Sequence, residues 1–279
     1  MSPPPIQSIE RKAAEPMGEN FLLFVAVGFA AQMVDGAIGM AYGITSTTVL
    51  LSMGVPPATA SACVHTAEVF TTGASGASHW KFGNIDRKLV WRLAIPGMIG
   101  GALGAYVLTE LPGDKLKPFV SAYLLLLGLF ILSKAIRRSA PSVLPPQNVA
   151  PLGFFGGLFD SIGGGGWGPI VTSTLLGQGT TPRYAIGSVS LSEFFVTLTI
   201  SLTFLLTIGL THWHIIAGLI LGGVLAAPFA AYATRHLPDK ALMIIVGSVV
   251  VLLSLRGIVM ALPSAKADFL ALGHLLSPG

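Results

Sequence analysis

The chain has 279 residues, of which 52% are hydrophobic and only 10% are charged, and its mean hydropathy is +0.76. An average soluble domain carries about 25% charged residues. So few charges cannot cover the surface of a soluble protein of this length, and the composition therefore excludes that class. The net charge of +4 comes from Lys and Arg near the breaks between apolar segments, which indicates membrane topology and not nucleic-acid binding.

Residues 1–19 contain three consecutive prolines and no apolar core, so they predict a polar tail and not a cleavable signal peptide. From residue 20 to residue 262, apolar stretches alternate with short charged or Pro-containing breaks. With their flanks, these stretches reach the ~20 residues that a helix needs to cross a bilayer. In lipid they must be helices, because open strand edges would leave backbone groups unpaired. The predicted helical segments are 20–53, 57–79, 89–110, 115–136, 152–177, 183–208, 213–235 and 239–262.

The sequence thus predicts an all-α integral membrane protein in a bacterial cytoplasmic membrane. A polar, Pro-rich linker at 137–151 separates its halves, and a C-terminal tail occupies 263–279. The single cysteine, Cys63, excludes an intramolecular disulfide framework, and no His/Cys cluster has zinc spacing. We therefore expect no metal and no cofactor, and a monomer and a homo-oligomer both stay open.

The two halves repeat one pattern. GFAAQMVDGAIGMAYG begins at Gly28 and GFFGGLFDSIGGGGWG begins at Gly153, which is an offset of 153 − 28 = 125 residues. Fifteen of the 45 positions from 28 to 72 are identical to the residue 125 later, and after one inserted residue the match continues at 126. Segments 20–136 and 152–262 are therefore predicted to be two homologous membrane repeats of about four helical segments each.

The first segment of each repeat is unusual. At ~1.5 Å per residue, a continuous helix over 20–53 would measure about 50 Å, which exceeds a hydrocarbon core of about 30 Å. Its centre is rich in glycine, and glycine weakens helices. We expect a broken or re-entrant element at this place in both halves.

The positive charges discriminate weakly between two topologies. If each half crosses the membrane four times, one side collects 11 of the 16 Lys and Arg residues and both termini are cytoplasmic. If the broken element returns to its own side, the repeats are inverted, the split is 10 against 6 and the termini lie outside. The charge rule favours the first arrangement.

The duplicated Gly-rich element, followed in each half by a Gly-x-x-Pro turn (54–57 and 179–182) and a helix of small residues, resembles the TauE/SafE family. Members of this family are sulfite and organosulfonate exporters, also described as sulfonate-uptake permeases. The resemblance covers residues 20–260. It implies a secondary transporter for a small sulfur-containing or carboxylated anion, and not an enzyme.

Four of the 12 acidic residues fall inside apolar segments, as two pairs at the repeat offset: Asp35 with Asp160, and Glu68 with Glu193. An ionisable group at membrane depth costs at least ~2.5 kcal/mol, so its presence in both halves requires a reason. One hypothesis is a proton or cation site between the repeats. The alternative is structural, with the aspartates capping the broken helix and the glutamates bonding to nearby backbone.

Polar residues share one face of the second helix in each half. Ser61, His65, Glu68 and Thr72 recur at helical spacing in the first half, and Ile186, Ser190, Glu193 and Thr197 are their equivalents. Facing each other, these stripes would form a polar central pathway, whose coupling residues are predicted as Asp35, His65, Glu68, Asp160, Ser190 and Glu193. Small residues that tighten a helix contact are the alternative explanation for the serines.

The restarted helices after the two breaks offer backbone N–H groups and a positive dipole end to an anion. Hydroxyl side chains add donors there, and glycine admits the ligand to the backbone. The predicted substrate-binding residues are Gly39, Gly43, Thr45, Ser46, Thr47, Thr48, Gly164, Gly165, Gly166, Thr172, Ser173 and Thr174. Close packing of helices is the alternative explanation for the glycines.

Four carboxylates near an anion would repel it, but burial disfavours the ionised form, so the sequence predicts proton-coupled transport. The main alternative is a cation transporter that uses the Asp and Glu residues as ligands. An intramembrane enzyme lacks any supporting motif. A passive assembly subunit would leave the paired acids unexplained.

Overall fold

The computed structural model describes residues 21–136, 149–178, 180, 182–233 and 239–261. Within them the chain forms helices and turns and no strand. The predicted tails at 1–19 and 263–279 lie outside the described residues, as does the linker up to residue 148. The last three linker residues, 149–151, instead begin a helix. The elements are α2 (Phe21–Ile38), α3 (Tyr42–Ser52), α4 (Pro57–Lys81), α5 (Arg87–Glu110), α6 (Gly113–Ile136), α7 (Val149–Gly163), the short π-helix η1 (Gly168–Thr172), α8 (Ser173–Gly177), α9 (Pro182–Thr207), α10 (Trp213–Ala233) and α11 (Asp239–Ala261).

Three of the described helical stretches are long and apolar enough to cross a membrane: Arg87–Glu110, Lys115–Ile136 and Tyr184–Thr207. Large apolar side chains point away from the protein on the outer helix faces, such as Leu126 and Leu206. Such a surface suits hydrocarbon, because lipid tails are as apolar as leucine.

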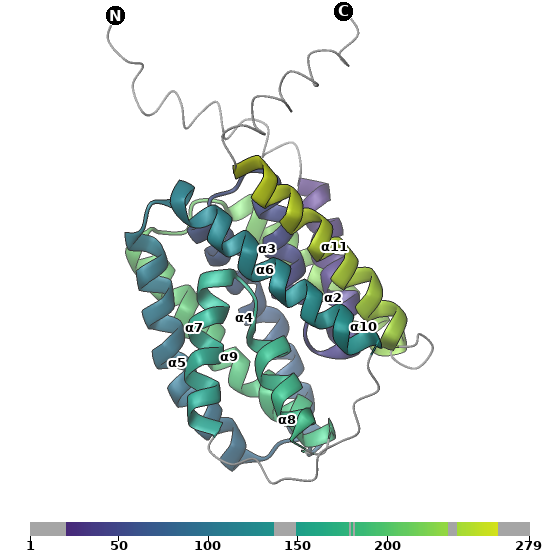
Figure 1. Ribbon diagram of the computed structural model, residues 1–279. Coiled ribbons are helices and arrows are strands. Elements are labelled where there is room, and N and C mark those ends of the chain that lie inside the picture. The colour runs from purple at the N-terminus through teal and green to yellow at the C-terminus, as the bar shows by residue number, and fades with distance from the viewer. Residues whose placement is uncertain (1–20, 137–148, 179, 181, 234–238, 262–279) are drawn as a thin grey trace, which may run out of the picture.

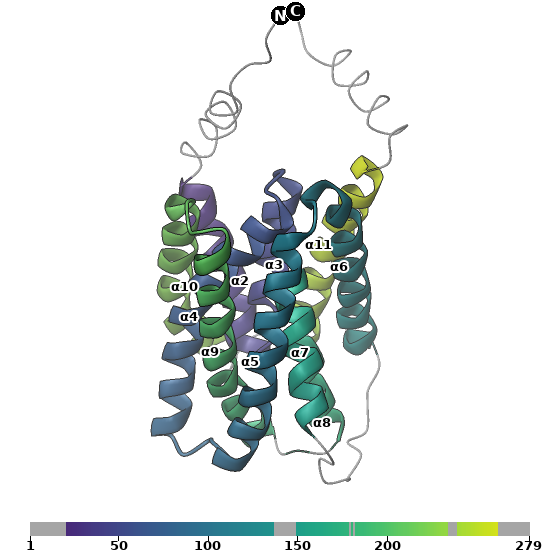
Figure 2. The ribbon, with the colours of Figure 1, turned by 90° about the vertical axis from the view of Figure 1, so that its left-hand side faces the viewer.

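The helices run between two ends of a bundle (Figure 2). We name the upper end by the turns 53–56, 111–112 and 208–212, because Gly113 lies beside Pro57 and residues 208–212 share a small cavity with Thr59. We name the lower end by the turn 82–86, where the Asp86 amide donates to Ser188 Oγ (2.9 Å) at the start of α9. Val149 and Thr180 share a pocket with Asp86, so α7 begins and α8 ends at this lower end.

The pair α2–α3 enters the bundle from the upper end and returns to it. Phe24, near the start of α2, contacts His214 at the start of α10 (6.0 Å between ring centroids), and α3 ends four residues before α4 begins at the upper end. The 11 residues of α3 rise about 16 Å, roughly half of a hydrocarbon core. The pair α7–α8 does the same from the lower end. This arrangement differs from the four-crossing topology that the charge rule favours, because the short second arms reverse direction before they cross.

Helices from the two halves interleave. α2 packs on α10, α7 packs on α5, α4 packs on α9, and α6 packs on α11 (Figures 1 and 2). The contact between α2 and α10 is close because a Cβ atom at Gly28 would lie 2.5 Å from the Leu219 carbonyl oxygen. The same contact occurs between α7 and α5, where a Cβ at Gly153 would lie 2.5 Å from the Leu93 carbonyl oxygen. Small residues allow this approach of two backbones, as is usual in membrane helix pairs.

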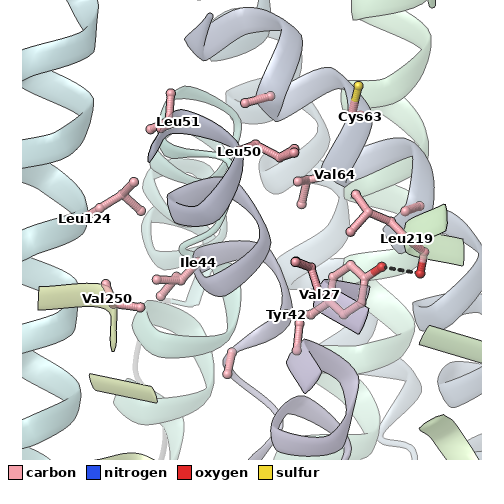
Figure 3. Close-up of a cluster of buried hydrophobic side chains, with 14 of the residues drawn as sticks. Val27, Tyr42, Ile44, Leu50, Leu51, Cys63, Val64, Leu124, Leu219 and Val250 are labelled. Atoms are coloured by element: carbon pink, nitrogen blue, oxygen red, sulfur yellow. Dashed lines mark hydrogen bonds between the residues drawn. The ribbon is translucent and has the colours of Figure 1, made fainter. Parts of the chain in front are cut away.

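Apolar side chains from α3 connect it to the surrounding helices. Ile44 and Leu50 are buried in a cluster that includes Val64 of α4, Leu124 of α6 and Val250 of α11 (Figure 3). A second cluster surrounds Trp167, beside α5 and α9. Each returning arm is therefore fixed by core packing and not only by its connections.

Candidate functional site

The first break lies between α2 and α3, and Asp35 caps the helix that follows it. Asp35 Oδ1 accepts hydrogen bonds from the amides of Ala41 (2.8 Å) and Tyr42 (3.2 Å). Gly39 has a φ of 71°, a left-handed conformation that glycine adopts without steric cost. The aspartate thus satisfies amides at the start of α3 that have no partner within the helix.

The second break, between α7 and η1, has the same capping contact 125 residues later. Asp160 Oδ1 accepts a hydrogen bond from the Trp167 amide (2.9 Å), and Gly164 has a φ of 65°. Both aspartates therefore cap the helix after the break, as the structural hypothesis predicts. Capping accounts for one oxygen of each carboxyl group.

The two breaks meet inside the bundle. A Cβ atom at Gly43 would lie 2.8 Å from Gly165 Cα and 3.0 Å from the Gly164 carbonyl oxygen. The Thr47 hydroxyl donates to that same carbonyl oxygen, which ties α3 to the opposite break. A side chain at Gly43 or Gly165 would separate the two breaks.

A small central cavity lies where the breaks meet, and all four intramembrane carboxyl groups line it. The lining residues are Asp35, Met40, Ala41, Tyr42, Gly43, Ile44, Glu68, Asp160, Gly165, Gly166, Gly168, Pro169 and Glu193. None of these is Lys or Arg. The open space is about 10 Å³, enough for the centre of about one water molecule.

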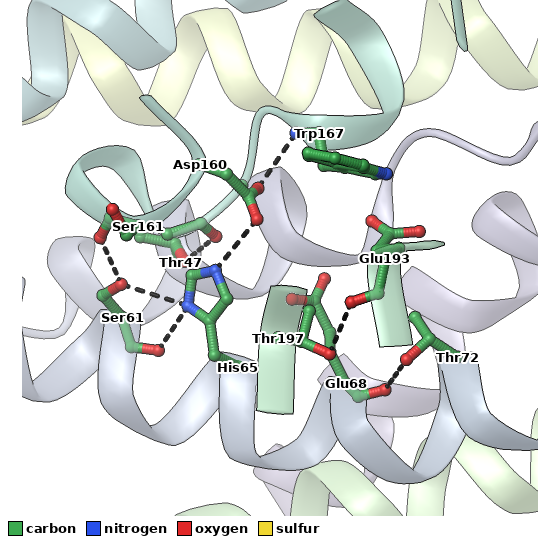
Figure 4. A network of polar contacts seen from close by, with 12 residues as sticks. Thr47, Ser61, His65, Glu68, Thr72, Asp160, Ser161, Trp167, Glu193 and Thr197 are labelled. Atoms are coloured by element: carbon green, nitrogen blue, oxygen red, sulfur yellow. Dashed lines mark hydrogen bonds and ion pairs between the residues drawn. The ribbon is translucent and has the colours of Figure 1, made fainter. Parts of the chain in front are cut away.

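The two glutamates differ from the aspartates because, among the described residues, no hydrogen bond engages the carboxyl group of Glu68 or Glu193. Glu68 is buried, and its Oε2 lacks a hydrogen-bond partner among the described residues. Its Oε1 would lie 2.8 Å from a Cβ atom at Gly43, which places the carboxyl group at the junction of the breaks. Figure 4 shows Glu68 and Glu193 on neighbouring helices beside this junction. A buried carboxyl group without a partner destabilises the protein, and helix packing alone does not require one at this position. Its presence therefore favours a functional role for Glu68.

His65 connects the polar face of α4 to Asp160 (Figure 4). Its Nε2 lies 3.2 Å from Asp160 Oδ2, within hydrogen-bond distance. Its Nδ1 lies 2.8 Å from the Ser61 carbonyl oxygen, while the Ser61 hydroxyl donates to the Ser161 carbonyl oxygen (2.6 Å). Ser190 is the repeat equivalent of His65, so the second half has no histidine at this position. Asp160 contacts a histidine from the other half, whereas the residue equivalent to that histidine for Asp35 is a serine.

The predicted hydroxyl donors lie around the cavity and not in its lining. Thr48 and Thr174 donate to helix carbonyl oxygens four residues earlier (each 2.6 Å), and Thr72 and Thr197 do likewise. The Oγ atoms of Thr45, Ser46 and Thr172 are buried without a partner among the described residues. Ser173 lies near Met40 and accepts a hydrogen bond from Lys134. Of the predicted binding residues, the structure brings Gly43, Gly165 and Gly166 to the cavity.

Two aromatic residues and one methionine at the site escaped the sequence analysis. Tyr42 lines the cavity, and its hydroxyl donates to the Leu219 carbonyl oxygen (3.0 Å), as drawn in Figure 3. Trp167, 125 residues later, packs its ring against Gly97 as Tyr42 packs against Gly223. An aromatic pair at the repeat offset was a detectable signal. Met40, with no such equivalent, gave none.

The chain is similar to a family of exporters and to two proteins named as probable membrane transporters. The family model described as "Sulfite exporter TauE/SafE" matches residues 24–257. The "Probable membrane transporter protein YtnM" of Bacillus subtilis (strain 168) is 41% identical over 250 residues, which cover 86% of this chain and 83% of that protein. The "Probable membrane transporter protein ORF9" of Sinorhizobium sp is 27% identical over 181 residues, or 62% of each chain. No solved structure matches.

A match over most of the chain confirms the resemblance noted in the sequence. Apolar helices and relatives that are membrane transporters place the protein in a bacterial cell membrane with several crossings. The chain belongs to the sulfite exporter TauE/SafE family, and it is a multi-pass membrane transporter.

Proposed function

We propose that the protein is a secondary transporter that moves a small anion, with sulfite and organosulfonates as the leading substrates, in exchange for or together with protons. The observation that carries this proposal is the meeting of two helix breaks at one cavity lined by four carboxyl groups. The family name supports sulfite as the first substrate to test.

The anion would bind between the first turns of α3 and η1. Amides in the first turn of a helix lack helical partners and lie at the positive end of its dipole. Gly43, Gly165 and Gly168 have no side chains, so the backbones of the two breaks meet directly at the cavity. Such a site holds an anion without a lysine or arginine in the lining.

Proton coupling follows from the carboxyl groups. With Glu68 and Glu193 ionised, their charges would oppose an anion at the cavity, and with both protonated, the repulsion disappears. Binding of the anion and binding of protons thus favour each other. This is a linkage between two sites, and it is reciprocal.

The cavity is closed in this conformation. A space for about one water molecule cannot hold sulfite, which has four non-hydrogen atoms. The two breaks must therefore separate to admit a substrate. Movement of one repeat against the other around a fixed site is a general mode of alternating access.

We also propose that 20–136 and 152–262 are copies of one ancestral unit in inverted orientation. Supporting this are the paired aspartate caps, the paired glycine contacts and the return of each first element to opposite ends. Among the described Lys and Arg residues, Lys81, Arg87, Lys88, Arg92, Lys134, Arg183 and Lys240 lie toward the lower end, and Lys115, Lys117 and Arg256 toward the upper end. The positive-inside rule then makes the lower end cytoplasmic.

A cation transporter is the second candidate, and the four carboxyl groups without a lining Lys or Arg favour it. Against it, the described residues contain no group of three or more His, Cys, Asp or Glu side chains arranged to hold a metal ion. A carrier of protons and anions needs no such group.

Flux through purified protein in proteoliposomes tests the proposal. Labelled sulfite, a sulfonate, a carboxylate and monovalent and divalent cations are compared, with and without an imposed pH gradient. We expect saturable flux of sulfite or a sulfonate that a pH gradient accelerates. Saturable flux of a metal cation alone would replace this proposal with the second candidate.

A further inference from the structure

Lys134 is a half-buried cation in the last turn of α6. Its Nζ donates to the Ser173 hydroxyl at the first residue of α8 (2.9 Å). Among the described residues, no carboxylate lies within ion-pair distance of it. Lys134 lies near the end of α6, and the structure places it against the returning arm α8.

A half-buried ammonium group bonded to a neutral hydroxyl keeps its positive charge uncompensated. Lysine has three N–H donors, and the bond to Ser173 uses one of them. Lysine is rarely buried without a paired acid, because removing a charge from water is costly. An anion would supply the negative charge that balances the ammonium group and would accept hydrogen bonds from its other two N–H groups.

Ser173 lies directly behind the wall of the central cavity. Its Oγ is 4.0 Å from Met40 Sδ, and Met40, which is buried, lines the cavity. The flexible Met40 side chain therefore lies beside both Ser173 and the cavity that the carboxyl groups line. Methionine has three rotatable side-chain bonds and can change rotamer with little loss of packing.

The position equivalent to Lys134 in the other half carries no charge. Met260 occupies the position 126 residues after Lys134, and Thr48, 125 residues before Ser173, donates to its own helix at Ile44. Lys134 therefore adds a positive charge beside the arm that enters from the lower end. Its repeat equivalent, Met260, is neutral.

We propose that Lys134 and Ser173 form an outer binding site for the transported anion, on a route from the lower end to the central cavity that Met40 closes. This inference rests on the proposed function, because it assigns an entrance to the same anion. The anion first meets the ammonium group, and displacement of the Met40 side chain then opens the path to Gly43 and Gly165.

Thiol labelling measures the charge and the access at this site directly. Ser173→Cys is introduced into a Cys63→Ala protein, which lacks the single native thiol. Inside-out and right-side-out vesicles are treated with an anionic reagent, sulfonatoethyl methanethiosulfonate, and with its cationic trimethylammonium analogue. The ratio of the two reaction rates reports the local charge.

We expect reaction in one vesicle orientation and a ratio that favours the anionic reagent. Lys134→Met should lower this ratio at least about fivefold, the effect of one unit charge at ~4 Å in water. Lys134→Arg should preserve it, and Lys88→Met, which removes an exposed charge from the same end, should leave it unchanged. An unchanged ratio in Lys134→Met, or no reaction in either orientation, would overturn the proposal.

Sulfite flux in the same variants separates this inference from the proposed function. Lys134→Met in the native background should raise the KM for sulfite offered from the lower end while the maximal rate is retained. If native protein carries sulfite and Lys134→Met has an unchanged KM, the outer site is wrong and the proposed function stands. If native protein carries no anion, the proposed function fails, whatever the labelling ratio shows.

Discussion

At the level of single residues, the four intramembrane acids divide into two kinds. Asp35 and Asp160 each commit one carboxyl oxygen to the amides that begin the following helix. Glu68 lies at the junction of the two breaks, where its Oε2 has no hydrogen-bond partner in the described part of the chain, and Glu193 lines the same cavity. The aspartates thus shape the backbone, and the glutamates are the residues that we propose to exchange protons.

Glu68→Gln and Glu193→Gln should therefore uncouple transport from the pH gradient. Glutamine retains the shape and the hydrogen-bonding capacity of a protonated glutamate but cannot release a proton. With one proton per substrate, a gradient of one pH unit sustains a substrate gradient of about tenfold, and we expect this to fall to about one in the double variant. Accumulation of labelled sulfite in proteoliposomes measures it.

The matched control is Glu110→Gln, which changes an exposed glutamate at the end of α5. It should accumulate substrate like the native protein. Full accumulation in the double glutamine variant would assign Glu68 and Glu193 a purely structural role.

The sequence located these acids but not their partners. The repeat offset identified both pairs because identical residues at equal spacing are visible in one chain. It could not show that His65 pairs with Asp160, since the two residues are 95 positions apart and lie in different halves. Nor could it show that Lys134 bonds to Ser173, because Ser173 lies on an arm whose direction only tertiary packing determines.

At the level of elements, the helix breaks carry the site. Each break reverses the chain through a left-handed glycine, and each restarted helix then packs against the opposite break. The glycine-rich composition predicts where the helix ends. It does not predict where the hydroxyl side chains after the break point. Some, such as Thr48, donate to a carbonyl oxygen of their own helix, and others, such as Ser46, are buried beside the cavity.

Gly43→Val should abolish substrate binding while the protein still inserts in the membrane. Even its Cβ atom would lie 2.8 Å from Glu68 Oε1 and from Gly165 Cα, so the added side chain forces the two breaks apart and fills the cavity. Gly165→Val should act alike, because its Cβ would clash with the Ile44 amide nitrogen. Thermal-shift titration with sulfite should show affinity at least about tenfold weaker, the loss expected for about 1.4 kcal/mol.

Gly113→Val serves as the control. A Cβ atom there would lie 3.7 Å from Pro57 Cδ, an ordinary contact far from the cavity. Native affinity in a well-folded Gly43→Val protein would move the substrate site away from the breaks.

At the level of the whole molecule, the direction of each first element determines the topology. A count of 11 against 5 positive charges and one of 10 against 6 differ by a single residue, so charge alone could not separate the two arrangements. The structure separates them because Phe24 and His214 meet at one end while Val149 and Asp86 share a pocket at the other.

Reporter fusions in the turns test this arrangement. We expect reporters at residues 55 and 210 on the same, external side and a reporter at residue 85 in the cytoplasm, since the turns containing 55 and 210 belong to the upper end. Alkaline phosphatase and fluorescent-protein fusions give opposite readouts at each position. Residues 85 and 210 on one side would restore the four-crossing topology.

The interleaved pairing of helices also has a consequence for biosynthesis. α2 begins at Phe21, and its partner α10 begins at Trp213, so 213 − 21 = 192 residues separate their first residues. At 5–20 residues per second, the ribosome needs roughly 10 to 40 seconds to deliver α10 after α2 has emerged. During that interval the glycine face of α2 has no native partner. Neither half can complete its native helix contacts alone, because the pairs α2–α10, α5–α7, α4–α9 and α6–α11 each join one helix from each half.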